Sequence, residues 1–235
     1  MIGEKEFDLI VDSVNTDADK RVKSIFPLHS GVDHLDISQT NQQQMIDMYE
    51  KLLTSAAVVK NSNTTWKTME SILSWIRSTD FYVAPASARY HDIVPTGLLY
   101  HTLKVYDNAC EMLKLSQFKS VPIESVAITS LVHDWCKINM YESYYKNEKN
   151  LDGEWEQVVA YRVNQKGIPL GHGASSLYLA EKCFKLSIEE ALAIRWHNGS
   201  YNVCTLEMPE YTRANEEYPL VRLLQFADQL AVTKY

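Results

Sequence analysis

The segment LVHDWCK (131–137) places a histidine next to an aspartate at the end of an apolar run. On a predicted helix the side chains of His133 and Asp134 diverge by about 100°, yet both reach an ion that lies between their directions. Burying an aspartate is costly unless something compensates its charge, and a divalent cation beside an imidazole does so. Alone, this dipeptide fits a helix cap or an internal ion pair equally well.

Four more polar residues stand where a helical protein would place core residues. Each lies at the apolar edge or at the end of a different predicted helix: His101, His172, His197 and Asp228. A single histidine of this kind is more commonly a satisfied core residue. A metal centre explains all six together, and imidazole and carboxylate ligands without thiolate suit Mn, Fe, Co, Ni or Zn better than Mg. The sequence therefore predicts a site for divalent transition-metal ions.

The elements that must position these residues are mainly helical. Apolar residues recur at helical spacing from residue 44, around 66–76, and over 97–106, 122–138, 171–184, 187–197 and 217–232. Residues 139–165 break this pattern, because an alternation of period two runs through 154–163 and the turn signal NLDG precedes it. We predict an all-α fold with a small β-hairpin inserted at about 139–165.

The predicted hairpin enters the chain between His133 and His172, so it should lie near the mouth of the site. Its aromatic and basic residues allow two interpretations. In one, the hairpin is a lid whose side chains stack on a base and hold a phosphate. The residues available for this are Tyr141, Tyr144, Tyr145, Trp155, Tyr161, Arg162 and Lys166. In the other, its alternating aromatic side chains cover the helical body as a small core, which is the commoner use of such a pattern.

The order His, His-Asp, His, His, Asp, with HDWCK matching an HD-x-x-K signature, resembles the HD-domain metal-dependent phosphohydrolase superfamily over residues 85–232. The stretch SARYHDIVPTGLLYH is closest to HD-domain 3′-5′ exoribonucleases and to uncharacterised phage or prophage HD hydrolases. The resemblance implies an HD-domain helical bundle. With it we expect an N-terminal extension of unclear role at 1–40, a helical preface packed on the core at 41–84, and the metal-binding domain at 85–235.

The resemblance also implies roles for individual residues. A first metal would be held by His101, His133, Asp134 and Asp228. Asp134 would bridge to a second metal, which His172 and His197 complete. Several two-metal members carry a second histidine where this chain has Asn198, a poorer ligand. A one-metal enzyme in which His172 and His197 contact phosphate therefore stays open.

Asp134, Lys137 and His91 are the predicted catalytic residues. In the implied reaction a metal-activated water attacks a phosphoester. Lys137 lies one helical turn after His133 and resembles the family's phosphate-contacting lysine, although a lysine at a helix end is also favoured by the helix dipole. His91 could protonate a leaving oxygen or be a plain turn residue. We expect Lys137, Tyr145, Arg162 and Asn198 to contact substrate.

The composition is that of an ordinary globular protein, and 235 residues suffice for one large domain. The net charge of −7 gives no electrostatic sign of duplex nucleic-acid binding and slightly favours a small substrate. The four cysteines show no C-x-x-C spacing, and no apolar run reaches membrane length, so we expect a cytoplasmic protein without a membrane partner. The sequence does not determine the oligomeric state.

The leading hypothesis is a metal-dependent phosphohydrolase or phosphodiesterase that acts on a nucleotide or a short oligonucleotide. One alternative is a 3′-5′ exonuclease on single-stranded RNA or DNA. Another is a di-iron oxygenase, because some HD-fold proteins use the same ligand set for oxidation. A binding protein that retains the scaffold without turnover is the third.

Overall fold

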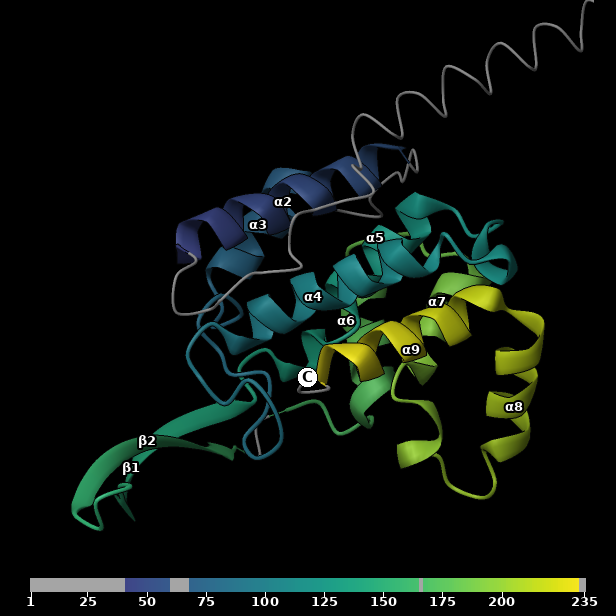
Figure 1. Ribbon diagram of the computed structural model, residues 1–235. Coiled ribbons are helices and arrows are strands. Elements are labelled where there is room, and N and C mark those ends of the chain that lie inside the picture. Colours follow the sequence, from purple (N-terminus) through teal and green to yellow (C-terminus); the bar gives the residue numbers. More distant parts are fainter. Residues whose placement is uncertain (1–40, 60–67, 165–166, 233–235) are drawn as a thin grey trace, which may run out of the picture.

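The computed structural model describes residues 41–59, 68–164 and 167–232. This part of the chain holds eight α-helices and one antiparallel hairpin (Figure 1), which confirms the predicted fold class. The helices are α2 (Gln42–Val59), α3 (Met69–Arg77), α4 (Gly97–Met112), α5 (Ile123–Val132), α6 (His172–Glu181), α7 (Ile188–Trp196), α8 (Met208–Glu217) and α9 (Pro219–Val232). The strands are β1 (Tyr141–Lys149) and β2 (Trp155–Val163). The predicted extension at 1–40 lies outside the described residues.

Helix α2 is anchored to the segment that carries His133 and Asp134. Its apolar stripe is buried, as its spacing predicts. At the centre of that stripe, the hydroxyl of Tyr49 donates to the carbonyl of Leu131 at 3.0 Å and accepts from the indole Nε1 of Trp135 at 2.9 Å. These two bonds hold the chain on both sides of the His-Asp pair.

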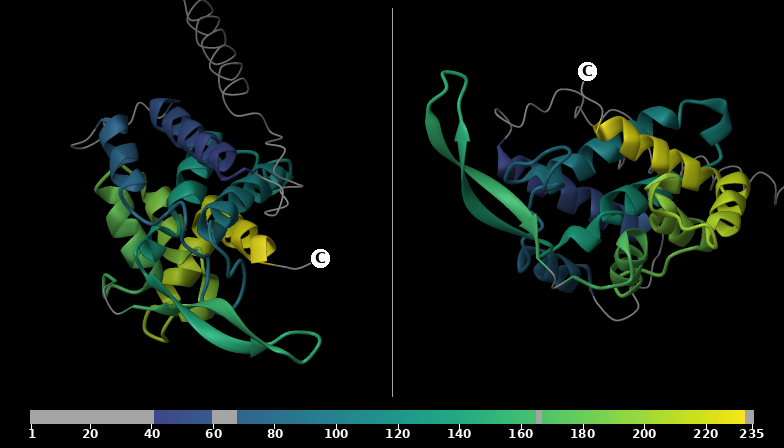
Figure 2. Two further views of the ribbon diagram at one scale, coloured as in Figure 1. Left: turned by 90° about the vertical axis from the view of Figure 1, so that its left-hand side faces the viewer. Right: turned by 90° about the horizontal axis from the view of Figure 1, so that it is seen from below.

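The remaining helices form the body around the site. Helix α4 packs on α5 and α9, α7 packs on α9, and α6 packs on α7 and on the 3₁₀ turn Trp135–Lys137 (Figures 1 and 2). One buried apolar cluster joins α2, α3, α4, α5, α6 and α7, and a second joins α4, α5, α7, α8 and α9. The residues directly after α5 and α7 and at the start of α6 lie close to one another around Asp134. None of the described helices combines the length and the hydropathy that a membrane crossing requires.

The hairpin extends away from the helical body in all three views (Figures 1 and 2). Its register runs from Tyr141 opposite Val163 to Lys149 opposite Trp155. At the turn, the Asn150 side chain accepts the backbone N–H groups of residues 152 and 154. Most aromatic side chains of the hairpin remain exposed, with Tyr145 at 73% and Trp155 at 70%. The interpretation that they cover the body as a small core is therefore wrong, because the strands leave the body and only their base contacts it.

The loop between α3 and α4 is closely fitted to the start of α4. The backbone N–H of Ala86 donates to the carbonyl of Asp92 at 3.1 Å, and a Cβ at Gly97 would lie 2.1 Å from that carbonyl oxygen. Asp92 and Thr96 adopt positive φ values of 45° and 69°. This arrangement fixes the position of His91, which immediately precedes Asp92.

Candidate metal centre

The structure brings the six predicted ligand residues together. They are His101 in α4, His133 and Asp134 directly after α5, His172 at the start of α6, His197 directly after α7, and Asp228 in α9. His101, His133, Asp134 and His197 are buried, whereas His172 and Asp228 are partly exposed. Groups of these side chains place three potential ligand atoms within 4.8 Å of one another. Buried His, Asp and Cys groups of this protein could thus hold metal ions.

Asp134 lies at the centre of the cluster, and its two oxygens face different pairs of imidazoles. Its Oδ2 lies 3.4 Å from Nε2 of both His101 and His133. Its Oδ1 lies 2.8 Å from Nε2 of His172 and 3.6 Å from Nε2 of His197. A carboxylate placed in this way can serve one ion with each oxygen.

Asp228 joins the first of these two groups only. Its Oδ1 lies 3.1 Å from Nε2 of His101 and 3.9 Å from Nε2 of His133. The group on the Oδ2 side of Asp134 therefore contains two imidazoles and two carboxylates. The group on the Oδ1 side contains two imidazoles and one shared carboxylate.

The tautomers of two histidines are fixed by backbone carbonyls. His133 Nδ1 lies 2.7 Å from the carbonyl of Ser130, and His197 Nδ1 lies 2.8 Å from that of Ile194. A carbonyl only accepts, so the proton of each neutral ring is on Nδ1 and the lone pair is on Nε2. Histidines that ligate metals are oriented by the same kind of bond.

His133 provides the sharpest test of whether a metal fits. Its Nε2 is buried and makes no hydrogen bond within the described part of the chain. A buried polar atom without a partner costs free energy, roughly 1–3 kcal/mol. A cation bonded to this lone pair removes the cost, and the neighbouring carboxylates offset the cation's charge. The residues present therefore fit a divalent cation.

The carboxylates of the cluster are ionised at neutral pH. Burial alone would raise the pKa of Asp134, but Lys137 and His133 outweigh burial and hold it well below its usual range. Burial would likewise raise the pKa of Asp228, and its hydrogen bond with His101 holds it low. Burial disfavours protonation of His101, yet its bonds to both carboxylates raise its pKa to about 9. Without metal, a proton on His101 thus offsets the negative charge of the two carboxylates, as a bound cation would.

The sequence analysis missed Cys136. Its Sγ lies 3.1 Å from Nδ1 of His172, and burial raises the pKa of the thiol to about 12, so the thiol is protonated at neutral pH. Cys136 belongs to the same HDWCK motif as Asp134, but the reasoning from ligand types assumed a set without sulfur. The structure shows that this thiol lies within the cluster and orients His172.

A pocket of about 240 Å³ opens onto the cluster, and we call it the metal-centre pocket. It is lined by Asp134 and Asp228, by the predicted catalytic residues Lys137 and His91, and by Asn198, Tyr201, Gln229 and Val232. Lys137 Nζ lies 2.7 Å from Oδ2 of Asp134, whose charge outweighs burial and raises the lysine pKa. The His91 ring lies 4.7 Å from the His101 ring, and its Nδ1 is 3.2 Å from the Asp92 carboxylate.

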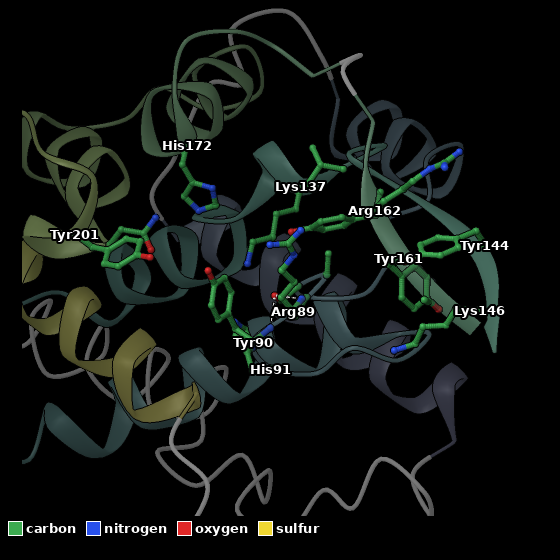
Figure 3. A pocket seen from close by; sticks show the side chains of 17 residues that line it. Arg89, Tyr90, His91, Lys137, Tyr144, Lys146, Tyr161, Arg162, His172 and Tyr201 are labelled. Atoms are coloured by element: carbon green, nitrogen blue, oxygen red, sulfur yellow. Dashed lines mark hydrogen bonds between the residues drawn. The ribbon is translucent and has the colours of Figure 1, made fainter. Parts of the chain in front are cut away.

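A second, larger cavity of about 780 Å³ lies between the base of the hairpin and the helical body, and we call it the hairpin groove (Figure 3). Three of the predicted substrate residues, Lys137, Arg162 and Asn198, line it. Tyr145 does not line it; the residues of β1 that do are Tyr141, Tyr144 and Lys146. Further lining residues that the sequence did not point to are Arg89, Tyr90, Lys146 and Tyr201.

Compared with models of protein families, with curated proteins and with solved structures, the chain matches none of them. The resemblance to the HD superfamily therefore rests on the motif residues. The argument for a metal centre rests on the geometry of the cluster.

Proposed function

We propose that residues 85–235 form an HD-type, metal-dependent phosphohydrolase or phosphodiesterase that hydrolyses a phosphoester of a nucleotide or a short oligonucleotide. One observation carries the proposal. The two oxygens of the buried Asp134 face separate imidazole pairs, and Nε2 of His133 in one of those pairs is buried without a hydrogen bond.

The residues that would hold metal divide into two groups. The first is His101, His133, Asp134 and Asp228, and the second is Asp134, His172 and His197. When bound, a divalent cation lowers the pKa of the water molecule that it holds and stabilises the charge that builds on phosphoryl oxygens. The second group has one carboxylate fewer, so it binds its ion with lower affinity than the first group does.

The protein's own side chains position the phosphate. Lys137 lines both the metal-centre pocket and the hairpin groove, so a phosphoryl oxygen can approach it from either cavity. Its bond to Asp134 keeps it in place before substrate arrives. Asn198 lines both cavities as well, and its amide can donate to a second phosphoryl oxygen.

His91 is placed to move a proton. It lines both cavities, and Asp92 accepts a hydrogen bond from its Nδ1 when that nitrogen is protonated. The other ring nitrogen is then available to a leaving oxygen.

The surroundings favour a phosphoester over the substrates of an oxygenase. Lys137 is a buried cation beside the cluster, and Arg89, Lys146 and Arg162 line the adjoining groove. This local positive charge attracts an anionic substrate. A neutral polyol gains nothing from it.

A screen with Mn²⁺ tests the proposal, using mononucleotides, cyclic nucleotides and short single-stranded RNA and DNA as substrates. We expect hydrolysis of at least one phosphoester, its loss with chelator, and its loss in Asp134→Ala. Asp80→Ala is the matched control, since Asp80 is a half-buried carboxylate that accepts from the backbone N–H of Asn139 and is not one of the cluster residues. Hydrolysis that survives in Asp134→Ala contradicts the proposal. An iron centre that consumes dioxygen, without any phosphoester hydrolysis, also contradicts it.

A further inference from the structure

The hairpin groove is basic in a protein whose net charge is −7. Four of its lining residues are cations: Arg89, Lys137, Lys146 and Arg162. Among the described residues that line it, none is an aspartate or a glutamate. A groove with this local charge attracts a polyanion even though the whole chain is acidic. The inference of a small substrate from net charge therefore does not extend to this surface.

The cations on the hairpin are free to exchange their present partners. Lys146 pairs with Glu148, and Arg162 pairs with Glu142, but all four side chains are between 45% and 65% exposed. Exposed pairs of this kind contribute little to stability, roughly 0–1 kcal/mol. A phosphate in the groove can therefore replace the glutamates at little cost.

Aromatic rings accompany the cations along the groove. Tyr90, Tyr144, Tyr161 and Tyr201 line it, and in Figure 3 they come from the loop before α4, from both strands and from the segment after α7. Tyr90 and Tyr201 are 77% and 80% exposed, so their faces are accessible to a ligand. Exposed rings alternating with cations are typical of surfaces that stack unpaired bases and hold the connecting phosphates.

The groove is continuous with the metal-centre pocket and is long enough for several nucleotides. The two cavities share His91, Lys137, Asn198 and Tyr201. On β1 the lining runs from Tyr141 to Lys146, five residue steps or about 17 Å of extended strand. At about 3.4 Å per stacked nucleotide this length corresponds to roughly five nucleotides.

We propose that the hairpin groove binds a single-stranded polynucleotide and directs one end of it to the metal centre. The inference rests on the proposed function for the reaction at that end, but binding in the groove stands apart from turnover. The strand stacks its bases on the tyrosines and places its phosphates against Lys146, Arg162 and Arg89. Stacking requires unpaired bases, so a duplex is excluded from the groove.

The experiment measures binding of fluorescein-labelled 12-nucleotide and 2-nucleotide oligo-dT and oligo-U to the full chain in EDTA, where no hydrolysis occurs. We expect the 12-mer to bind at least about tenfold more tightly than the 2-mer, from two or more additional stacked bases. Tyr144→Ala should weaken 12-mer binding at least about fivefold. Tyr145→Ala is the matched control, because it removes the neighbouring tyrosine of the same strand, which does not line the groove, and it should leave binding unchanged.

The salt dependence isolates the charged contacts. Lys146→Ala should reduce the slope of log K against log salt concentration by about 0.7, the value for one phosphate contact with a single strand. Lys149→Ala removes the same charge from the same strand outside the groove and should leave the slope unchanged. Equal effects of Lys146→Ala and Lys149→Ala would show that only the overall charge of the hairpin matters, which contradicts a binding groove.

Three further outcomes overturn the inference: equal binding of 12-mer and 2-mer, equal binding of a 12-base-pair duplex, and equal binding of polyphosphate of matched charge. Each leaves Mn²⁺-dependent hydrolysis of a mononucleotide, and hence the proposed function, intact. Tight binding of the 12-mer without any metal-dependent hydrolysis does the reverse. It supports polynucleotide binding in the hairpin groove and refutes phosphoester hydrolysis at the metal centre. A preference between oligo-U and oligo-dT identifies the polynucleotide as RNA or DNA.

Discussion

Divalent metal should raise the thermal stability of this protein through Asp134. The carboxylate lies within 3.6 Å of all four imidazole Nε2 atoms, so Asp134→Asn weakens both ligand groups with one substitution. An ion at 100 times its dissociation constant stabilises the folded state by about 2.7 kcal/mol. For a domain of this size each kcal/mol shifts the melting temperature by about 2–4 °C, so one ion should raise it by about 5–11 °C.

Asp134→Asn also changes the metal-free protein, and the sign of that change is a second test. The carboxylate lies 2.7 Å from the buried ammonium of Lys137. Removing one partner of a buried ion pair costs about 3–5 kcal/mol. We therefore expect the metal-free variant to melt at a lower temperature than the metal-free parent chain.

Differential scanning fluorimetry with a titration of Mn²⁺ or Zn²⁺ measures both effects. His172→Ala removes a residue of the second group only and should retain the shift due to the first ion. Asp80→Asn removes a carboxylate bond outside the cluster and should lower the melting temperature while keeping the full metal-induced shift. A metal-induced shift that is equal in Asp134→Asn and the parent chain would refute the reasoning.

Three other substitutions test the scaffold around the site. Tyr49→Phe leaves two buried partners of its hydroxyl unsatisfied and should lower the free energy of unfolding by about 2–4 kcal/mol in urea titrations, with the far-ultraviolet circular dichroism unchanged. Gly97→Ala places a Cβ 2.1 Å from the carbonyl oxygen of Asp92, so it should displace the loop that carries His91 and lower both the melting temperature and any hydrolytic rate. The pKa of Glu50 is held below its usual value by hydrogen bonds from Arg77, so its contribution to stability is present above about pH 4.5 and is lost as the pH falls through the lower pKa of the folded state. Glu50→Gln should flatten this acid limb of the stability profile, and an unchanged limb would contradict the assignment.

The helical scaffold and the position of the hairpin were accessible from the sequence because both depend on local patterning. Helix α2 buries one stripe of apolar residues, and periodicity alone specifies that stripe. The hairpin follows from alternation on either side of a turn centred on Asn150. The sequence did not show whether the hairpin packs against the helical body. Alternation determines which residues share a face, but whether that face meets the body depends on the direction in which the strands leave it.

Only some residues of the candidate site could be predicted from the sequence, because the others are brought to the site by the fold alone. His133 and Asp134 are conspicuous because they interrupt an apolar segment, and the other predicted ligands are conspicuous in the same way. Cys136 is not, because a cysteine at an apolar position is an ordinary core residue and only the fold brings it to His172. The choice of Tyr145 over Tyr144 also missed the tyrosine that lines the groove, since alternation does not show which strand residues meet the helical body.

The cations of the hairpin groove show the limit of reasoning from composition. Arg89 and Lys146 lie more than 50 residues apart in the chain, and each is an unremarkable surface residue in the sequence. Their convergence on one cavity follows from the path of the loop before α4 and from the direction of β1. A net charge averages over these separate surfaces, so it carries no information about a local basic groove.

Anomalous X-ray scattering from crystals grown with Mn²⁺ or Zn²⁺ locates the bound metal ion. We expect an anomalous peak about 2.0–2.2 Å from Nε2 of His133 and from an oxygen of Asp134, with Asp228 and His101 completing the ligands. A cluster that remains without an anomalous peak while the metal is bound elsewhere on the chain would contradict this expectation.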